Sequence, residues 1–426
     1  VMASLAQVAS DYLFQLFGAD GVAGNPNSGW VLLVGVGWIV AMTAICYVGI
    51  EISANFQKVL LGVEVTMLLV LSVVALVKVG SGHAPIGHLA PSWSWFNPFA
   101  IASPEDFMVG FTLMLFIYWG WDTAVSVNEE TKDRDKTPGR AAVTSTVILL
   151  ATYALVIMAT QSYAGIGSSG IGLGNTNHEG DVLTVLGGSI FGSSGFGTFL
   201  TKLLILMVLS SAAASTQTTI LPTARTTLSM AVFKAIPSSF SKIHKRFLTP
   251  TVSTIVMGAV SVALYVGMNY LSNGNAVISD SVSALGVWIA FYYGLTGLEC
   301  VWFYRHTLLE SPRNLWLRGI LPGLGWLILW FAMGWAFWYY YQPVNSYTTW
   351  TMPLTHLHMG GVFVLDISGV IIGIILMVVY ARLRPAYFRG EVLNRDTPTR
   401  VPQDIGTPVG LFGIEPTAEK EPTQAG

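Results

Sequence analysis

Long apolar stretches recur along this sequence, and they constrain its fold more than any other feature. A helix needs about 20 predominantly apolar residues to cross the hydrocarbon core of a bilayer. Runs of this kind occupy nine segments: 30–50, 58–78, 107–127, 143–163, 200–222, 252–271, 284–304, 320–341 and 362–381. Residues 1–18 have the character of the end of a tenth. With 53% hydrophobic and 10% charged residues, the sequence predicts an all-α integral membrane protein.

The basic residues predict the orientation of these spans, because loops rich in Lys and Arg stay on the cytoplasmic side. If successive loops alternate between the two sides, 19 of the 21 basic residues fall on one side, and only Lys78 and Lys202 fall on the other. We therefore expect a multi-pass protein of the cell membrane with a cytoplasmic C-terminus. The segment 164–199 becomes a long outer loop, and its short apolar stretch predicts a small helix.

Two regions follow from composition. Residues 1–385 form one transmembrane domain, and residues 386–426 form a cytoplasmic tail rich in Pro, Thr, Gly and Glu that we expect to be disordered.

Several classes of function find no support in the sequence. Cys46 and Cys300 both lie inside spans, so a disulfide is not indicated. The pair His356 and His358 is too small a set to predict a metal site. A glycine pattern at 165–170 matches a dinucleotide motif, but it follows an apolar helix and lacks the required strand. The sequence predicts no cofactor, no metal, no nucleic-acid partner and no enzymatic activity.

The segment 107–127 is unlike the other spans because it carries glycine and aspartate near its middle, in "FIYWGWD". Gly120 is a weak helix former, so we expect the helix to be interrupted there. A break at membrane depth is tolerated where it lines a cavity, and transporters bind substrate at such breaks. The residues predicted to bind substrate are Phe116, Tyr118, Trp119, Gly120, Trp121 and Asp122.

Two interpretations of Asp122 remain open. Its carboxylate is well placed to cap the second half-helix, which is the interpretation we favour, or it binds substrate directly. Of Trp119 and Trp121, we expect one ring to contact substrate and the other to pack.

The segment "FIYWGWDTAVSVNEETKDRDKTPGR" resembles the sixth helix and following loop of the amino acid–polyamine–organocation (APC) permeases. Downstream, "LILMVLSSAAASTQTTILPTARTTLSMA" resembles their eighth helix. The resemblance covers residues 1 to about 385. It implies the LeuT-like fold, which is built from two inverted repeats, with helices three to twelve of the family present here.

Helices one and two of the family have no counterpart in this reading of the sequence. The family's first helix carries an unwound segment that holds the substrate carboxylate. We therefore expect that the 426-residue chain by itself does not transport.

Glu64 lies in an otherwise uncharged span and should face the protein interior, because an acid exposed to lipid is costly. Proton-coupled relatives carry a lysine at about this place, so the resemblance implies a proton or cation site at Glu64 with Ser210 and Ser211 of the candidate eighth helix. The alternatives are a structural glutamate, and serines that only pack between helices.

The function that follows is secondary active transport of amino acids or related amines by alternating access, coupled to a proton or cation such as sodium. Two alternatives remain open. One is exchange of one substrate for another, and the other is a transport-incompetent protein that acts as a sensor or subunit.

Overall fold

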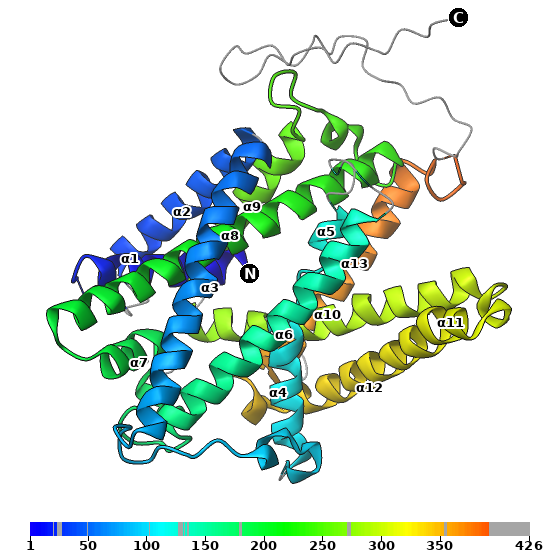
Figure 1. Cartoon of the computed structure of the whole chain (residues 1–426). Helices are drawn as coiled ribbons and strands as arrows, with labels where there is room; N and C mark the ends of the chain where they lie inside the picture. The colour runs from blue at the N-terminus through cyan, green and yellow to red at the C-terminus, as the bar shows by residue number, and fades with distance from the viewer. Residues whose placement is uncertain are drawn as a thin grey trace, which may run out of the picture.

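The computed structural model describes residues 1–19, 21–23, 28–48, 50–101, 103–126, 131, 133, 136–178, 181–270, 274–352 and 356–391. Most of the predicted C-terminal tail, from residue 392 onward, lies outside the described residues. Helices dominate the described part of the chain (Figure 1). The α-helices are α1 Met2–Leu16, α2 Gly29–Val48, α3 Ile50–Gly80, α4 Pro104–Ile117, α5 Thr123–Ser126, α6 Thr137–Ala164, α7 Val182–Phe191, α8 Gly195–Val232, α9 Thr251–Tyr270, α10 Gly274–Tyr304, α11 Pro312–Asn314, α12 Leu321–Tyr341 and α13 Gly361–Leu383.

Among the described residues, the named strands form one small antiparallel hairpin. Strand β1 (Thr349–Thr351) pairs with β2 (His358–Gly360), and Trp350 lies opposite Met359. The hairpin joins α12 to α13. His358 lies in β2, with its Nδ1 atom 3.0 Å from the Thr351 hydroxyl, and no group of three or more His, Cys, Asp or Glu side chains able to hold a metal ion occurs among the described residues.

Eight helices in the described ranges are long and apolar enough to cross a membrane. They match eight of the nine predicted spans and confirm an all-α membrane protein. The ninth, 107–127, is not one continuous helix, because α4 ends at Ile117 and α5 begins at Thr123. The apolar stretch predicted in the loop 164–199 forms the short helix α7.

The helices pack in two neighbouring groups (Figure 1). In the first, α8 contacts α1, α2, α3, α7 and α9. In the second, α10 contacts α4, α12 and α13. Helix α8 contacts α5, and α6 contacts both α3 and α5. The broken segment between α4 and α5 therefore lies where the two groups meet.

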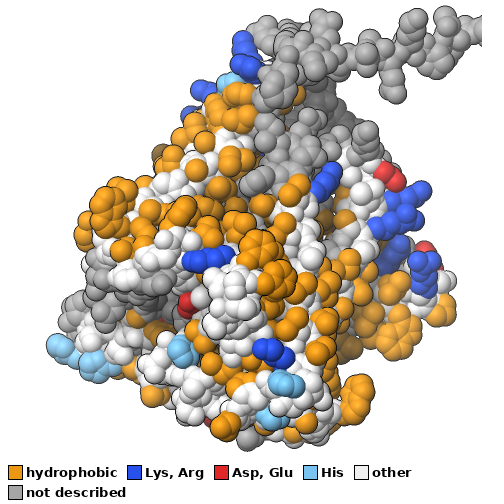
Figure 2. All heavy atoms as spheres, turned by 60° about the vertical axis from the view of Figure 1, so that its left-hand side comes forward, with side chains coloured by type: hydrophobic (Ala, Val, Ile, Leu, Met, Phe, Trp, Pro, Cys, Tyr) orange, Lys and Arg blue, Asp and Glu red, His pale blue; other side chains and the backbone are white. Residues whose placement is uncertain are grey.

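The outer surface is largely apolar, as a lipid environment requires. In the most apolar 18-residue stretch of α6, 6% of the residues are buried inside the protein. Hydrophobic side chains cover much of the face in Figure 2, and most of the Lys and Arg side chains visible there lie toward its upper and right-hand margins. Such a surface is stable in hydrocarbon, whereas in water it would favour aggregation.

Lys78 and Lys202, the basic residues predicted to face away from the cytoplasm, both bind backbone carbonyls. The Lys202 ammonium donates to the Gln15 carbonyl oxygen at 2.6 Å and to that of Leu16 at 3.1 Å. These carbonyls end α1, where the helix dipole favours a cation. The Lys78 ammonium lies 3.5 Å from the Ser189 carbonyl oxygen.

Candidate functional site

The predicted interruption of the span 107–127 is present in the structure. Ser103 caps α4 by accepting a hydrogen bond from the Asp106 N–H at 3.0 Å, and the helix then continues to Ile117. The next residues form turns until α5 begins at Thr123. Gly120 has a φ of +121°, a backbone conformation that L side chains rarely adopt. The glycine therefore permits the turn that ends the first half-helix.

Backbone polar groups are left unpaired at this turn. The carbonyl oxygens of Tyr118 and Trp119 and the N–H groups of Trp121 and Asp122 have no hydrogen-bond partner among the described residues. In hydrocarbon, each such group would cost several kcal/mol. They are tolerated here because they border a cavity, and they give that cavity both acceptors and donors.

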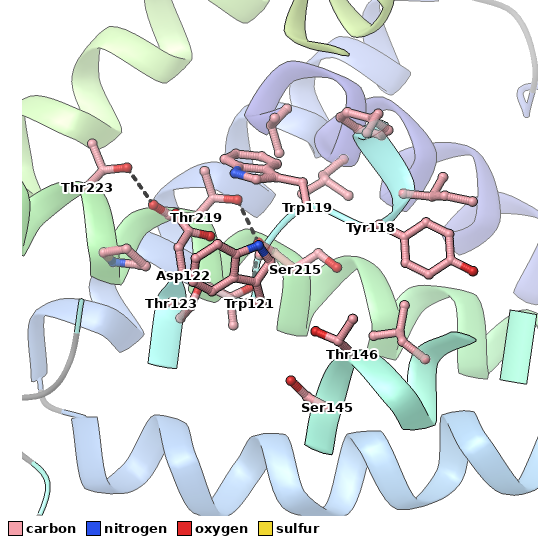
Figure 3. Close-up of a pocket in the computed structure, with 18 of the residues that line it drawn as sticks. Tyr118, Trp119, Trp121, Asp122, Thr123, Ser145, Thr146, Ser215, Thr219 and Thr223 are labelled. Carbon is pink, nitrogen blue, oxygen red and sulfur yellow. Dashed lines mark hydrogen bonds between the residues drawn. The ribbon is translucent and has the colours of Figure 1, made fainter. Parts of the chain in front are cut away.

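The cavity has a volume of about 470 Å³, and the broken segment forms one of its walls. Its other walls come from α1, α6 and α8. Figure 3 shows Ser215, Thr219 and Thr223 of α8 near Trp121 and Asp122, with Ser145 and Thr146 of α6 on another side. All six residues predicted to bind substrate line it: Phe116, Tyr118, Trp119, Gly120, Trp121 and Asp122. The structure therefore brings these residues to one cavity.

Hydroxyl groups on α6 and α8 make this cavity rich in hydrogen-bond acceptors. Thr219 donates to the Ser215 carbonyl oxygen and Thr223 to that of Thr219, both at 2.8 Å. On α6, Ser145 and Thr146 donate to the Ala142 carbonyl oxygen at 3.0 and 2.8 Å. Each of these hydroxyls has its proton directed into its own helix, so its oxygen offers lone pairs. The cavity wall is therefore suited to hydrogen-bond donors on a ligand.

Asp122 is the one carboxylate among the cavity's lining residues, and two tyrosines of α10 hold it. The Tyr293 hydroxyl donates to Oδ1 at 3.1 Å, and the Tyr292 hydroxyl donates to Oδ2 at 3.2 Å. The Gly120 N–H donates to the Tyr293 oxygen at 3.2 Å. The carboxylate is thus anchored to α10. From the sequence we favoured a role for Asp122 as the cap of α5, but in the structure its carboxylate accepts its hydrogen bonds from these two tyrosines.

Both tryptophans contact the same tyrosines. The Trp119 indole N–H donates a hydrogen bond to the Tyr292 hydroxyl. The Trp121 ring lies 5.2 Å from the Tyr293 ring, centroid to centroid. Since both tryptophans also line the cavity, the structure does not separate them into one substrate contact and one packing residue.

Glu64 lies apart from the lining residues and is bound to α8. The Ser211 hydroxyl donates to the Glu64 Oε1 atom at 3.0 Å, which links α3 to α8. Ser210 is not brought to Glu64, because its hydroxyl donates to the Met207 carbonyl oxygen of its own helix at 2.8 Å. Tyr153 is close enough to Glu64 to interact with its charge. Its hydroxyl also donates to the Ile117 carbonyl oxygen at 3.1 Å, at the end of α4.

Sequence reasoning missed Tyr153, Tyr292 and Tyr293. Tyrosines are common in apolar spans, and nothing in the pattern of α6 or α10 marks these three. The contact between α10 and the broken segment spans about 170 positions, from Asp122 to Tyr292. Such a pairing becomes visible only once the helices are packed.

Comparison with known proteins places this site in a family. The model of the amino acid permease family matches residues 1–382. An uncharacterized transporter of Mycobacterium tuberculosis (strain H37Rv) is 28% identical over 236 residues, which is 54% of this chain and 48% of that protein. The methylthioribose transporter of Bacillus subtilis is 22% identical over 327 residues, which is 72% of this chain and 64% of that protein.

The chain thus spans from about half to about two thirds of the length of these relatives. The family match covers nearly all of the described residues, including the broken segment and every helix around the cavity. The family is one of membrane transporters, not of enzymes. The chain belongs to the amino acid permease family.

Proposed function

We propose that this protein is a secondary active transporter of amino acids or related amines that binds its substrate in the cavity beside Gly120. One observation carries the proposal: six residues chosen from the sequence as binding residues line a single cavity of about 470 Å³ at a broken helix. Ligand cavities in proteins commonly have volumes of about 300–1,000 Å³, so an amino acid fits.

The chemistry of the walls suits a zwitterion. The N–H groups of Trp121 and Asp122, which precede α5, have no partner among the described residues and can donate hydrogen bonds to a substrate carboxylate. The carbonyl oxygens of Tyr118 and Trp119 lie at the end of the first, where a cation is favoured. The hydroxyl oxygens of α8 add acceptors for an ammonium group. We therefore place the substrate's charged groups along the turn from Tyr118 to Asp122.

Glu64 is proposed as the coupling site. Its bond to Ser211 joins α3 to α8, and α8 supplies one wall of the cavity. Tyr153 on α6, a helix that packs against α3, lies within electrostatic range of Glu64 and also lines the cavity. Protonation of Glu64 would remove the negative charge from the contact between α3 and α8. Because α8 forms one wall of the cavity, proton binding could in this way alter the position of that wall. Ser210 plays no direct part in this proposal.

A polyol-like substrate is the second candidate. One relative is named for methylthioribose transport. The carboxylate of Asp122 already accepts from two tyrosine hydroxyls, which weakens its attraction for an ammonium group. The hydroxyl oxygens of α6 and α8 would bind a sugar by accepting hydrogen bonds from its hydroxyl groups. Exchange of substrates is the alternative to coupled uptake for either substrate class.

We also propose that the C-terminus faces the cytoplasm of the cell membrane. The bias of basic residues supports this orientation, with 19 of 21 on one side of the predicted topology. A reporter fused to the C-terminus that is active only in the cytoplasm tests it.

The test of function is uptake in proteoliposomes, measured for the 426-residue chain, which we expect not to transport by itself, and for a protein that also carries any segment encoded before residue 1. Labelled amino acids, diamines and methylthioribose are offered in turn, with and without a proton or sodium gradient. Gradient-driven accumulation of an amino acid or amine supports the first proposal. Accumulation of methylthioribose alone supports the second candidate, and uptake that requires internal substrate establishes exchange. Failure of every substrate to enter under all gradients would refute transport of these classes.

A further inference from the structure

A second acidic site lies in the bundle of α10, α12 and α13, away from the cavity beside Gly120. Asp366 is the only charged residue of α13 before Arg382, near the helix end. Its side chain is 1% exposed, and its Oδ1 atom is buried without a hydrogen-bond partner among the described residues. Intramembrane acids of this kind are rare and usually functional.

Asp280, a buried acid in the same bundle, differs from Asp366 because both of its carboxylate oxygens have hydrogen-bond donors. Its carboxylate accepts hydrogen bonds at 2.9 Å from the N–H groups of Tyr347 and Thr348, and a further one from the Thr348 hydroxyl. These donors stabilise a negative charge even though Asp280 is fully buried. Asp366 lacks such donors on Oδ1, and an ionised carboxylate there would be strongly unfavourable. The contrast favours a neutral, proton-carrying Asp366.

The place of Asp366 is fixed by the packing of α13 along α10. A Cβ atom built on Gly361 would meet Asp280, and one built on Gly369 would meet the Trp288 ring at 3.2 Å. The two helices therefore run side by side in the same direction. Asp366 lies between these two contacts, deeper in the bundle than Asp280.

A route from the surface leads toward this position. A cavity of about 390 Å³ is lined by Asp280, Ser283, Tyr340 and Val362, among others. Its rim includes Val344, which is 85% exposed, so the cavity opens at the surface. Tyr340 belongs to one buried cluster with Val362, and Leu365, the neighbour of Asp366 on α13, packs against the same cluster. Tyr340 also lies within electrostatic range of Asp366. Val362 is one helical turn from Asp366 on α13.

We propose that Asp366 is a proton-binding site whose proton exchanges with the solution through this second cavity by way of the Tyr340 hydroxyl. Of the titratable groups on neighbouring helices, Tyr340 on α12 lies within electrostatic range of Asp366, whereas Asp280 on α10 lies beside Gly361, more than one helical turn from Asp366 along α13. The site is separate from Glu64, and the proposal does not depend on which substrate is carried.

Infrared spectroscopy of the reconstituted full-length protein tests the proposal without a transport assay. A protonated carboxyl group has a C=O absorption distinct from that of a carboxylate. We expect such a band at neutral pH, its loss in Asp366→Asn, and its persistence in Glu64→Gln. Asp366→Asn keeps the shape of the neutral acid, so it should leave the melting temperature unchanged. If no component of the band is lost in Asp366→Asn while persisting in Glu64→Gln, the assignment is overturned.

The route is tested by exchange into D2O. The Asp366 band should shift within the time of buffer exchange in the wild-type protein, and the shift should be at least several-fold slower in Tyr340→Phe. Tyr270→Phe is a matched control, because Tyr270 is 79% exposed and lies on α9. An equally fast shift in Tyr340→Phe would refute the role of Tyr340 in the route, and a band that never shifts would refute access from the second cavity.

Discussion

Replacing Tyr293 by phenylalanine should weaken substrate binding, because Tyr293 holds the turn that presents the unpaired backbone groups. The change removes one hydroxyl and keeps the ring that packs on Trp121. That hydroxyl donates to Asp122 at 3.1 Å and accepts from the Gly120 N–H at 3.2 Å. Both contacts lie within the broken segment. Its conformation should therefore be less populated in the variant.

The size of the effect follows from these two hydrogen bonds. A hydrogen bond to a charged group contributes about 1.5–3 kcal/mol, and an unsatisfied buried donor costs about 1–3 kcal/mol. Asp122 keeps its bond from Tyr292, and the segment borders a cavity that water can enter, so the lower end applies. A loss of about 2 kcal/mol corresponds to an affinity reduced by up to about 30-fold.

The assay is equilibrium binding of a transported substrate to the purified full-length protein, with Tyr270→Phe as the control at an exposed tyrosine. A double-mutant cycle with Asp122→Asn adds a measure of coupling, which should be at least about 0.5 kcal/mol for residues in direct contact. If Tyr293→Phe binds substrate within twofold of the wild type and the cycle shows no coupling, Tyr293 does not set the site's geometry.

Three further predictions follow from individual contacts. Gly120→Leu should abolish uptake while membrane insertion stays normal, because leucine rarely adopts the φ of +121° found at Gly120. Gly110→Leu in α4 is the control and should retain activity, since an added Cβ meets nothing within 4 Å at either glycine. Saturable uptake by Gly120→Leu would contradict the assigned site. Glu64→Gln should remove the dependence of uptake on pH or sodium, and an unchanged dependence with normal accumulation would make Glu64 structural. Gly258→Ala should lower the melting temperature, because its Cβ would approach the Thr43 Cγ2 atom to 2.6 Å and overpacking costs about 1–3 kcal/mol. Gly267→Ala on the same helix meets nothing within 4 Å and should melt like the wild type, so equal melting of both variants would refute the steric argument.

The sequence by itself determined that the protein lies in a membrane, which segments cross it and where one helix is broken. Apolar runs of membrane length are a local property, so eight spans could be located without tertiary information. The break at Gly120 was also local, because one residue combines low helix propensity with freedom at positive φ. These same local signals carried the family resemblance, which the family match over residues 1–382 confirms.

Only the tertiary structure decided which side chains meet at the break. The tyrosines that hold Asp122 come from α10, and the hydroxyls facing it come from α6 and α8. Asp366 is an acid within a predicted span, but only the packing of α10, α12 and α13 shows that its carboxyl group is buried and that Oδ1 has no hydrogen-bond partner among the described residues. Helices that cross a membrane are apolar nearly all round, so their sequences carry little periodic signal to show which face meets which neighbour. Those pairings depend on how the whole set of helices packs.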